Sequence, residues 1–195
     1  MRGRSDPAAA LLSGVQNADA PPRMNVFLVG PMGSGKSAVG RQLAQRLNLE
    51  FIDSDAEIEA RTGVDIAYIF EREGEAGFRS REAEVIDAIS RRDRVLVSTG
   101  GGAVLDAGTR ERLRTRGRVV YLRTSVDQQL ARTRRSNDRP LLNNDDPRGT
   151  LERLFEQRAP LYTEVAEIVV DTDGRKVKTV VDHICRQLGV GEVGP

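Results

Sequence analysis

The stretch GPMGSGKSAVG, residues 30–40, limits the possible folds more than any other part of this 195-residue chain. Gly30, Gly35, Lys36 and Ser37 fit the pattern G-x-x-x-x-G-K-[ST]. In this pattern backbone N–H groups surround a polyphosphate, the lysine meets its outer phosphates and the hydroxyl binds Mg²⁺. The alternative is a glycine-rich turn with an incidental lysine, but lysine occurs only at positions 36, 176 and 178, so a chance match is rare.

The residues on either side of this loop support the phosphate interpretation. NVFLVG (25–30) is a short apolar run of the kind expected for a buried parallel strand. After the loop, Val39, Leu43 and Leu47 recur on one face of a predicted helix. The N-terminus of that helix would add its partial positive charge to the phosphate site. The expected phosphate contacts are Gly33, Ser34, Gly35, Lys36, Ser37 and Ala38.

Composition limits the number of domains and the kind of partner. With 38% hydrophobic residues, the chain can bury one good core, which we place in residues 24–190 as a single domain. The 30 basic and 29 acidic residues leave a net charge of +1, so we expect small-molecule partners, no nucleic acid and no membrane. One cysteine, Cys185, excludes an internal disulfide and predicts a reducing, cytoplasmic location.

The two ends of the chain differ from this domain. Residues 1–23 are dominated by alanine, proline and glycine, and we interpret them as a disordered extension, with a short transit peptide as the alternative. Residues 191–195 are expected to form a flexible tail.

Strand and helix patterns alternate along the domain. Apolar runs occur at residues 26–30, 51–53, 95–99, 119–123 and 167–171, and the clearest helical stretches are 81–92 and 150–162. This alternation predicts an α/β fold with a parallel sheet between helices, whose ligands bind beyond the carboxyl ends of the strands.

Acidic residues follow two of these runs. An aspartate at the end of an apolar strand supports Mg²⁺ in enzymes with this loop, and both Asp53 and Asp171 could do so. We favour Asp53, because its strand directly follows the helix after the loop. Asp55 is then free to accept a hydrogen bond from a hydroxylated substrate. A cap or first-turn acid of the next helix is the alternative for Asp55.

Three successive glycines follow the run at 95–99. Gly100, Gly101 and Gly102 would let the backbone approach a ligand closely and offer N–H donors. A flexible turn alone could explain two of them, and the third favours a ligand contact.

These fragments together resemble one known family. GPMGSGKSAVG, DSD, GEAGFRSRE, STGGG, RPLL and QRAPLYTEVA occur in the order and approximate spacing of shikimate kinases, over about residues 24–188. The resemblance implies a three-layer nucleoside-monophosphate-kinase-like fold with a five-stranded parallel sheet flanked by helices, and a mobile lid. It also implies Mg²⁺-dependent transfer of the γ-phosphoryl group of ATP to the 3-hydroxyl of shikimate, in aromatic amino-acid biosynthesis.

The resemblance also assigns roles to individual residues. Asp55, Arg79, Gly101 and Arg158 resemble the shikimate-binding positions. The lid, about residues 131–146, carries Arg139, which resembles the arginine that reaches the ATP phosphates. Arg175 resembles the adenine-side position, and Arg132 has a supporting role near the nucleotide. Lys36, Asp55 and Arg139 are the expected catalytic residues.

Physical chemistry supports part of this assignment. Guanidinium groups suit a carboxylate on the acceptor, because they bind it bidentately and stay charged. Arg79, within the expected substrate-binding region at about 54–82, and Arg158, outside that region, are therefore reasonable ligands. Both could instead be surface charges. Phe70 and Phe78 could back the ligand ring or belong to the core.

Two other functions fit parts of the pattern. A related kinase acting on gluconate or another small polyol would share the loop and the sheet, but it gives no reason for two carboxylate-directed arginines. A nucleotide-dependent switch normally carries an N-K-x-D motif, which this sequence does not contain.

We expect the protein to be a monomer.

Overall fold

The computed structural model contains one sheet of five parallel strands in the order β2-β3-β1-β4-β5. It describes residues 24–133 and 145–190. The strands are β1 (Val26–Val29), β2 (Glu50–Asp53), β3 (Val95–Ser98), β4 (Arg118–Arg123) and β5 (Ile168–Asp171). Each overlaps one of the five predicted runs, so the predicted parallel sheet is confirmed.

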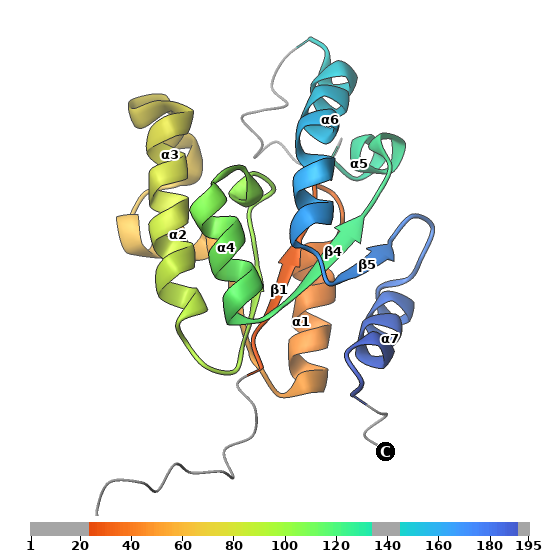
Figure 1. The fold of residues 1–195 in the computed structure, drawn as a ribbon. Coiled ribbons are helices and arrows are strands. Elements are labelled where there is room, and N and C mark those ends of the chain that lie inside the picture. The colour runs from red at the N-terminus through yellow and green to blue at the C-terminus, as the bar shows by residue number, and fades with distance from the viewer. Residues whose placement is uncertain (1–23, 134–144, 191–195) are drawn as a thin grey trace, which may run out of the picture.

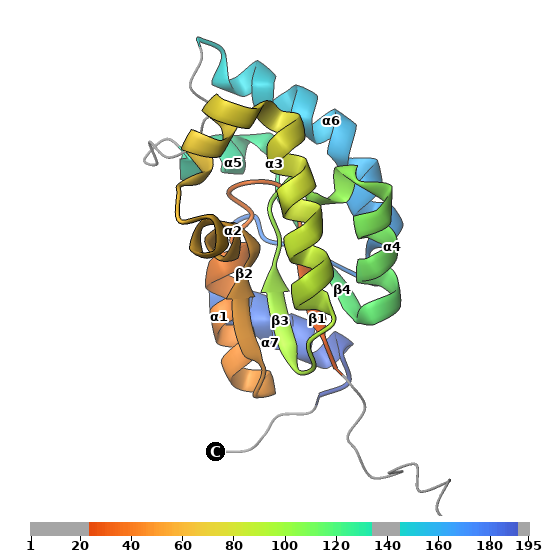
Figure 2. The same cartoon turned by 90° about the vertical axis from the view of Figure 1, so that its left-hand side faces the viewer.

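Helices connect successive strands and cover both faces of the sheet (Figures 1 and 2). They are α1 (Lys36–Leu47), α2 (Ser54–Thr62), α3 (Ile66–Ser90), α4 (Ala107–Arg116), α5 (Val126–Thr133), α6 (Pro147–Val165) and α7 (Val177–Gln187), with a short 3₁₀ turn, η2, at Ala103–Leu105. The predicted helix at 150–162 falls within α6, and the one at 81–92 overlaps α3 and extends two residues beyond its end at Ser90. No helix in the two described ranges is long and apolar enough to cross a membrane.

The apolar residues form two cores, one on each face of the sheet. In β1, Val26 and Leu28 face the core shared with α1 and α7, whereas Phe27 and Val29 face the core shared with α2, α3, α4 and α6. This alternation follows from the two-residue period of a strand. Val39, Leu43 and Leu47 of α1 are buried in the first core, as their helical spacing predicts. The three-layer architecture is therefore confirmed.

The strand order places the glycine loop after β1 at the centre of the sheet. β1 pairs with β3 on one side and with β4 on the other. The chain goes from β1 to β2 on one side of the sheet and later goes from β3 to β4 and β5 on the other side, so the direction of the connections reverses at β1. A crevice forms at such a point in a parallel sheet, outside the carboxyl ends of the strands. The loop, Asp53 and the triple glycine all lie at this end.

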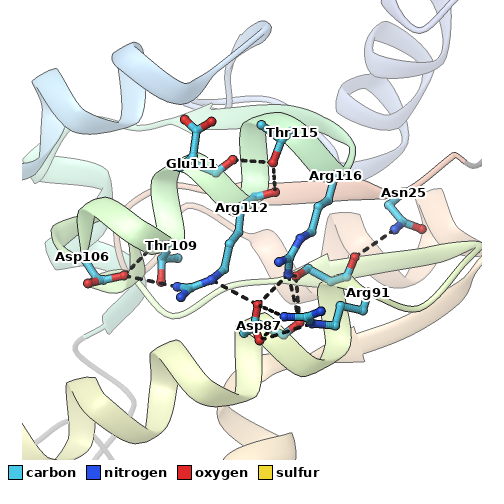
Figure 3. A network of polar contacts seen from close by, with 10 residues as sticks. Asn25, Asp87, Arg91, Asp106, Thr109, Glu111, Arg112, Thr115 and Arg116 are labelled. Carbon is cyan, nitrogen blue, oxygen red and sulfur yellow. Dashed lines mark hydrogen bonds and ion pairs between the residues drawn. The ribbon is translucent and has the colours of Figure 1, made fainter.

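Many arginines support the opposite end of the sheet. Asp87 of α3 forms ion pairs with Arg91 at the end of the same helix and with Arg112 and Arg116 of α4, and the last two join α3 to α4 (Figure 3). Asn25 adds a bond from Nδ2 to the carbonyl of Arg92, at 2.7 Å. These arginines have a structural role away from the crevice.

Three predicted segments lie outside the described residues: the N-terminal extension (1–23), the tail (191–195) and most of the lid (about 131–146). The described ends of that lid are the last residues of α5 and Asp146, whose side chain caps α6 by accepting from the N–H of Gly149.

Candidate active site

The loop between β1 and α1 encloses the amine of Lys36. Nζ donates to the carbonyl oxygens of Gly30 and Pro31, each at 2.8 Å, and to Oγ of Ser34 at 3.4 Å. α1 begins at Lys36 with Gly35 as its N-cap, a residue that has no side chain to occupy the first N–H groups of the helix. The loop therefore offers both a positive charge and backbone donors to an anion.

Ser37 and Asp53 meet beside the loop. Oγ of Ser37 donates to Oδ2 of Asp53 at 2.8 Å, and Oδ1 of Asp53 accepts from the N–H of Asp55 at 3.2 Å as the cap of α2. Asp171, the alternative to Asp53, instead pairs with Arg123 on the edge of the sheet, with one contact at 2.9 Å. The geometry favours Asp53 as the metal-supporting carboxylate.

A hydroxyl and a carboxylate together suit Mg²⁺, which prefers oxygen ligands and keeps several positions for water and phosphate. Within the described ranges, no group of three or more histidine, cysteine or acidic side chains forms an all-protein metal site. Ser37 and Asp53 fit an ion that the nucleotide shares.

Asp55 lies in the first turn of α2, the position that the alternative interpretation gave it, and it also faces the crevice. Burial raises the pKa of its carboxyl group, and the neighbouring Asp53 raises it further, while Lys36 and Arg79 act in the opposite direction. A carboxylate held in this way can accept a proton more readily than an exposed aspartate.

We expect Asp55→Asn to raise the melting temperature at pH 7 by a few degrees. The pKa of Asp55 is higher in the folded protein than in the unfolded chain. The protonated carboxyl group therefore contributes stability that is fully present below the unfolded pKa. This stability is lost as the pH rises through the folded pKa. Asparagine has almost the same shape and no charge. Thermal melts from pH 4 to 8 should show a difference that shrinks toward pH 4, and a mutant that melts lower at pH 7 would contradict this account.

The triple glycine makes room for side chains of the crevice. A Cβ on Gly100 would lie 2.2 Å from Oε1 of Glu82 and 2.9 Å from Oδ1 of Asp55, and a Cβ on Gly102 would lie 2.2 Å from Cζ of Arg79. One expectation needs correction. The N–H of Gly100 is not open to a ligand, because it donates to Oγ of Ser54 at 2.9 Å.

Two arginines from distant segments lie against these glycines. Arg79 of α3 pairs with Glu82 at 2.6 Å and with Glu75 at 3.1 Å. Arg158 of α6 has only 5% of its surface exposed, and its Nη1 is the side-chain atom nearest to a Cβ on Gly101, at 3.8 Å. Burial lowers the pKa of Arg158, and repulsion from Arg79 lowers it further. Both guanidinium groups thus border the triple glycine, and guanidinium groups are well suited to bind a carboxylate.

Glu82 and Tyr162 are site residues that the sequence prediction missed. Glu82 is 2% exposed, and among the described side chains its Oε1 and Nε of Arg158 are buried without a hydrogen-bond partner. Tyr162 donates its hydroxyl to the carbonyl of Gly101. Glu82 could have been found from its place three residues after Arg79, which puts both on one helix face. Tyr162 has a comparable signal, since it lies four residues after Arg158 on α6.

The two phenylalanines are part of the core. Phe78 is 4% exposed, and Phe70 packs against the same core, with the two ring centroids 4.8 Å apart. The core alternative is therefore the better interpretation of both.

A cavity of about 310 Å³ lies between the glycine loop, the two aspartates and the first two glycines of the triple glycine. The site residues predicted from the sequence that line this cavity are Gly33, Gly35, Lys36, Ser37, Ala38, Asp53, Asp55, Gly100, Gly101 and Arg132. Ser34, Arg79, Gly102, Arg158 and Arg175 are not among its lining residues, although Arg79, Gly102 and Arg158 border the triple glycine.

Arg132 and Arg175 approach the loop from the side of β5. Arg132 donates to the carbonyl oxygens of Gly33, at 2.8 Å, and Thr172, at 3.2 Å. The N–H of Arg175 donates to the same Thr172 carbonyl at 3.2 Å, and its side chain is exposed. Arg132 therefore contacts the loop directly, whereas Arg175 contacts the Thr172 carbonyl that Arg132 also binds. Arg139 lies outside the described residues.

The chain is similar to known proteins over nearly the whole domain. A family model described as shikimate kinase matches residues 32–189. The shikimate kinase of Shewanella amazonensis is 54% identical over 167 residues, which cover 86% of this chain and 98% of that protein. The solved shikimate kinase of Acinetobacter baumannii in complex with shikimate is 44% identical, with a TM-score of 0.84, over 89% of this chain and 97% of that one.

A gluconokinase from Sinorhizobium meliloti shares the fold alone, at 18% identity and a TM-score of 0.53 over 86% of this chain and 92% of that one. The family match and the high identities, together with the geometry of the loop, the acidic strand end and the two arginines, lead to one conclusion: the chain belongs to the shikimate kinase family.

Proposed function

We propose that this chain is a shikimate kinase, which transfers the γ-phosphoryl group of ATP to the 3-hydroxyl of shikimate and gives shikimate 3-phosphate and ADP. One observation carries the proposal. The crevice brings a phosphate loop and a buried carboxylate, Asp55, to the same triple glycine against which two arginines lie. A polyphosphate donor and a carboxylate-bearing alcohol would thus meet at one point. The product belongs to chorismate and aromatic amino-acid biosynthesis.

The nucleotide half consists of residues 33–38 with Arg132 and Arg175. In this proposal the backbone of the loop holds the phosphates, and Lys36 moves from the loop carbonyls to the outer phosphates, where it stabilises charge on the transferring oxygens. Ser37 and Asp53 would hold Mg²⁺, which supplies further charge neutralisation when it is bound. Arg139 stays a prediction from the family resemblance for the same phosphates.

The acceptor half consists of Asp55, Arg79, Arg158 and the triple glycine. Arg79 and Arg158 bind the carboxylate of shikimate, which fixes the ring so that its 3-hydroxyl faces Asp55. The oxygen of that hydroxyl forms the new bond to the γ-phosphorus as the bond to the β–γ bridging oxygen breaks, and Asp55 accepts the hydroxyl proton. Because phosphoryl transfer passes through a loose transition state, positioning contributes more than the strength of the base.

A coupled assay of product formation tests this proposal. The protein is incubated with ATP, Mg²⁺ and shikimate, and ADP release and shikimate 3-phosphate are both measured. Gluconate and no acceptor serve as controls for a polyol kinase and for a nucleotide switch. ADP release that does not depend on shikimate would refute the proposal.

Substitution of Asp53 should change the dependence on Mg²⁺, and substitution of Asp55 should change acceptor binding. We expect Asp53→Asn to raise the Mg²⁺ concentration needed for half-maximal activity, because it removes the carboxylate bound to Ser37. Asp55→Asn should weaken acceptor binding about tenfold, with ATP binding nearly unchanged. Separate titrations of Mg²⁺ and shikimate for both variants check this, and exchanged phenotypes would mean exchanged roles.

Two expectations about the whole protein complete the proposal. We expect the protein to act as a monomer, because one chain supplies every proposed site residue. A cytoplasmic location is supported by the use of only one cysteine, Cys185, which is buried in the core.

A further inference from the structure

α3 bends sharply at Gly74, six residues after Tyr68 and five residues before Arg79. There the backbone has φ 68° and ψ −176°, a conformation outside the helical region that L-residues adopt only under strain. The bend divides α3 into a first arm, residues 66–73, and a second arm, residues 75–90. The second arm carries Arg79 within its first two turns.

Two contacts cross the bend, and each joins residues eight positions apart. The rings of Phe70 and Phe78 have centroids 4.8 Å apart. Arg81 binds Glu73 with both ends of its guanidinium group, Nε at 2.8 Å and Nη2 at 2.7 Å. In a straight helix, residues eight apart are separated by about 12 Å along the axis. Both contacts therefore depend on the bend and also hold it.

Gly77 provides the space for the ionic contact. A Cβ on Gly77 would lie 2.4 Å from Cβ of Glu73 and 3.0 Å from its Oε2. The side chain of Glu73 thus passes directly over Gly77 to reach Arg81. Gly74 permits the bend, and Gly77 permits the pair that closes it.

The bend lies next to the acceptor-binding arginine. Arg79 contacts Glu75, the first residue after Gly74, and Glu82, and its guanidinium group lies against Gly102. Arg79 lies close to the start of the second arm, so its position depends on how firmly that end of the arm is held. The Glu73–Arg81 pair is on the outer side, with 38% and 42% of the two side chains exposed, and is not part of the crevice.

We propose that Glu73 and Arg81 are positioning residues for Arg79: their ion pair holds the bend of α3 and so increases the affinity for the acceptor carboxylate. The kinetic part of this proposal rests on the proposed function. The pair touches no substrate, so it should act on acceptor binding alone.

The test uses Glu73→Gln, which keeps the shape and removes the charge. We expect the KM for shikimate to rise about two- to fivefold, the range of a well-aligned exposed ion pair, with kcat and the KM for ATP unchanged. The double variant Glu73→Arg with Arg81→Glu should recover most of the loss. Glu71→Gln, an exposed glutamate on the first arm, is the matched control.

Gly77→Ala tests the bend together with the pair. The new methyl group would lie 2.4 Å from Cβ of Glu73, an atom that moves only with the backbone, so the first arm must shift and carry Glu73 away from Arg81, while alanine itself favours the helix. Gly77→Ala should also raise the KM for shikimate, an effect that loss of helix propensity cannot explain. The ratio of the Glu73→Gln and wild-type KM values should approach one in about 1 M salt, where the pair is screened.

An unchanged KM for shikimate in both Glu73→Gln and Gly77→Ala would overturn the proposal, as would a lower melting temperature without any change in KM. Hydrogen exchange over residues 66–73 gives a readout that needs no activity. We expect faster exchange in Glu73→Gln than in wild type without any ligand. A wild-type protein inactive on shikimate would refute the proposed function, whereas equal exchange in the two proteins would refute the role of the pair.

Discussion

In Lys36→Met, phosphoryl transfer to shikimate is expected to fall about a hundred- to a thousandfold. The substitution keeps a side chain of similar length and removes the positive charge that the loop encloses. That charge has no substitute among the loop residues, whose other donors are neutral backbone N–H groups and hydroxyls. Turnover at saturating shikimate and ATP measures the effect.

Lys178→Met is the matched control, because Lys178 is exposed on α7 and does not line the crevice. It should retain wild-type turnover. Circular dichroism should show the same spectrum for both variants and for wild type. A folded Lys36→Met protein with turnover near that of wild type would exclude the loop from the chemistry.

Most of the fold could be predicted because its elements repeat local patterns. The run at 95–99 is apolar on both faces, as expected for a strand between two layers, and β3 is buried throughout. The bend at Gly74 could not be predicted in this way. Gly74 lies inside α3, and only its backbone angles in the folded protein, φ 68° and ψ −176°, distinguish it from a tolerated helical glycine.

The part of the site that consists of a local sequence motif and a strand end could be predicted. Lys36, Ser37 and Asp53 follow from a motif and a strand end, and the structure brings them together. Glu82 and Tyr162 have predicted arginines three and four residues away on their own helices, but their burial at the site depends on tertiary packing, as in the bond from Tyr162 to the Gly101 carbonyl. The N–H of Gly100 was assigned wrongly for the same reason, since its acceptor, Ser54, belongs to another element.

Arg79→Ala should weaken shikimate binding about ten- to a hundredfold while ATP binding stays nearly unchanged. The substitution removes a charge-assisted bond to the acceptor carboxylate. It also leaves Glu82 buried without its cation, which lowers stability. Arg79→Lys therefore accompanies it, since lysine keeps the charge but not the planar fork that binds a carboxylate bidentately. Arg61→Ala, which removes an exposed arginine paired with Glu57, is the control.

Shikimate with its carboxylate replaced by a neutral amide separates recognition from general damage to the site. Wild-type protein should bind shikimate much more tightly than the amide, because both Arg79 and the buried Arg158 lose their anionic partner. Arg79→Ala should discriminate much less, since it has already lost half of that interaction, and Arg79→Lys should lie between the two. Affinities come from calorimetric titration of each ligand. Equal discrimination by wild type and Arg79→Ala would mean that Arg79 does not bind the carboxylate, and the acceptor half of the site would need another assignment.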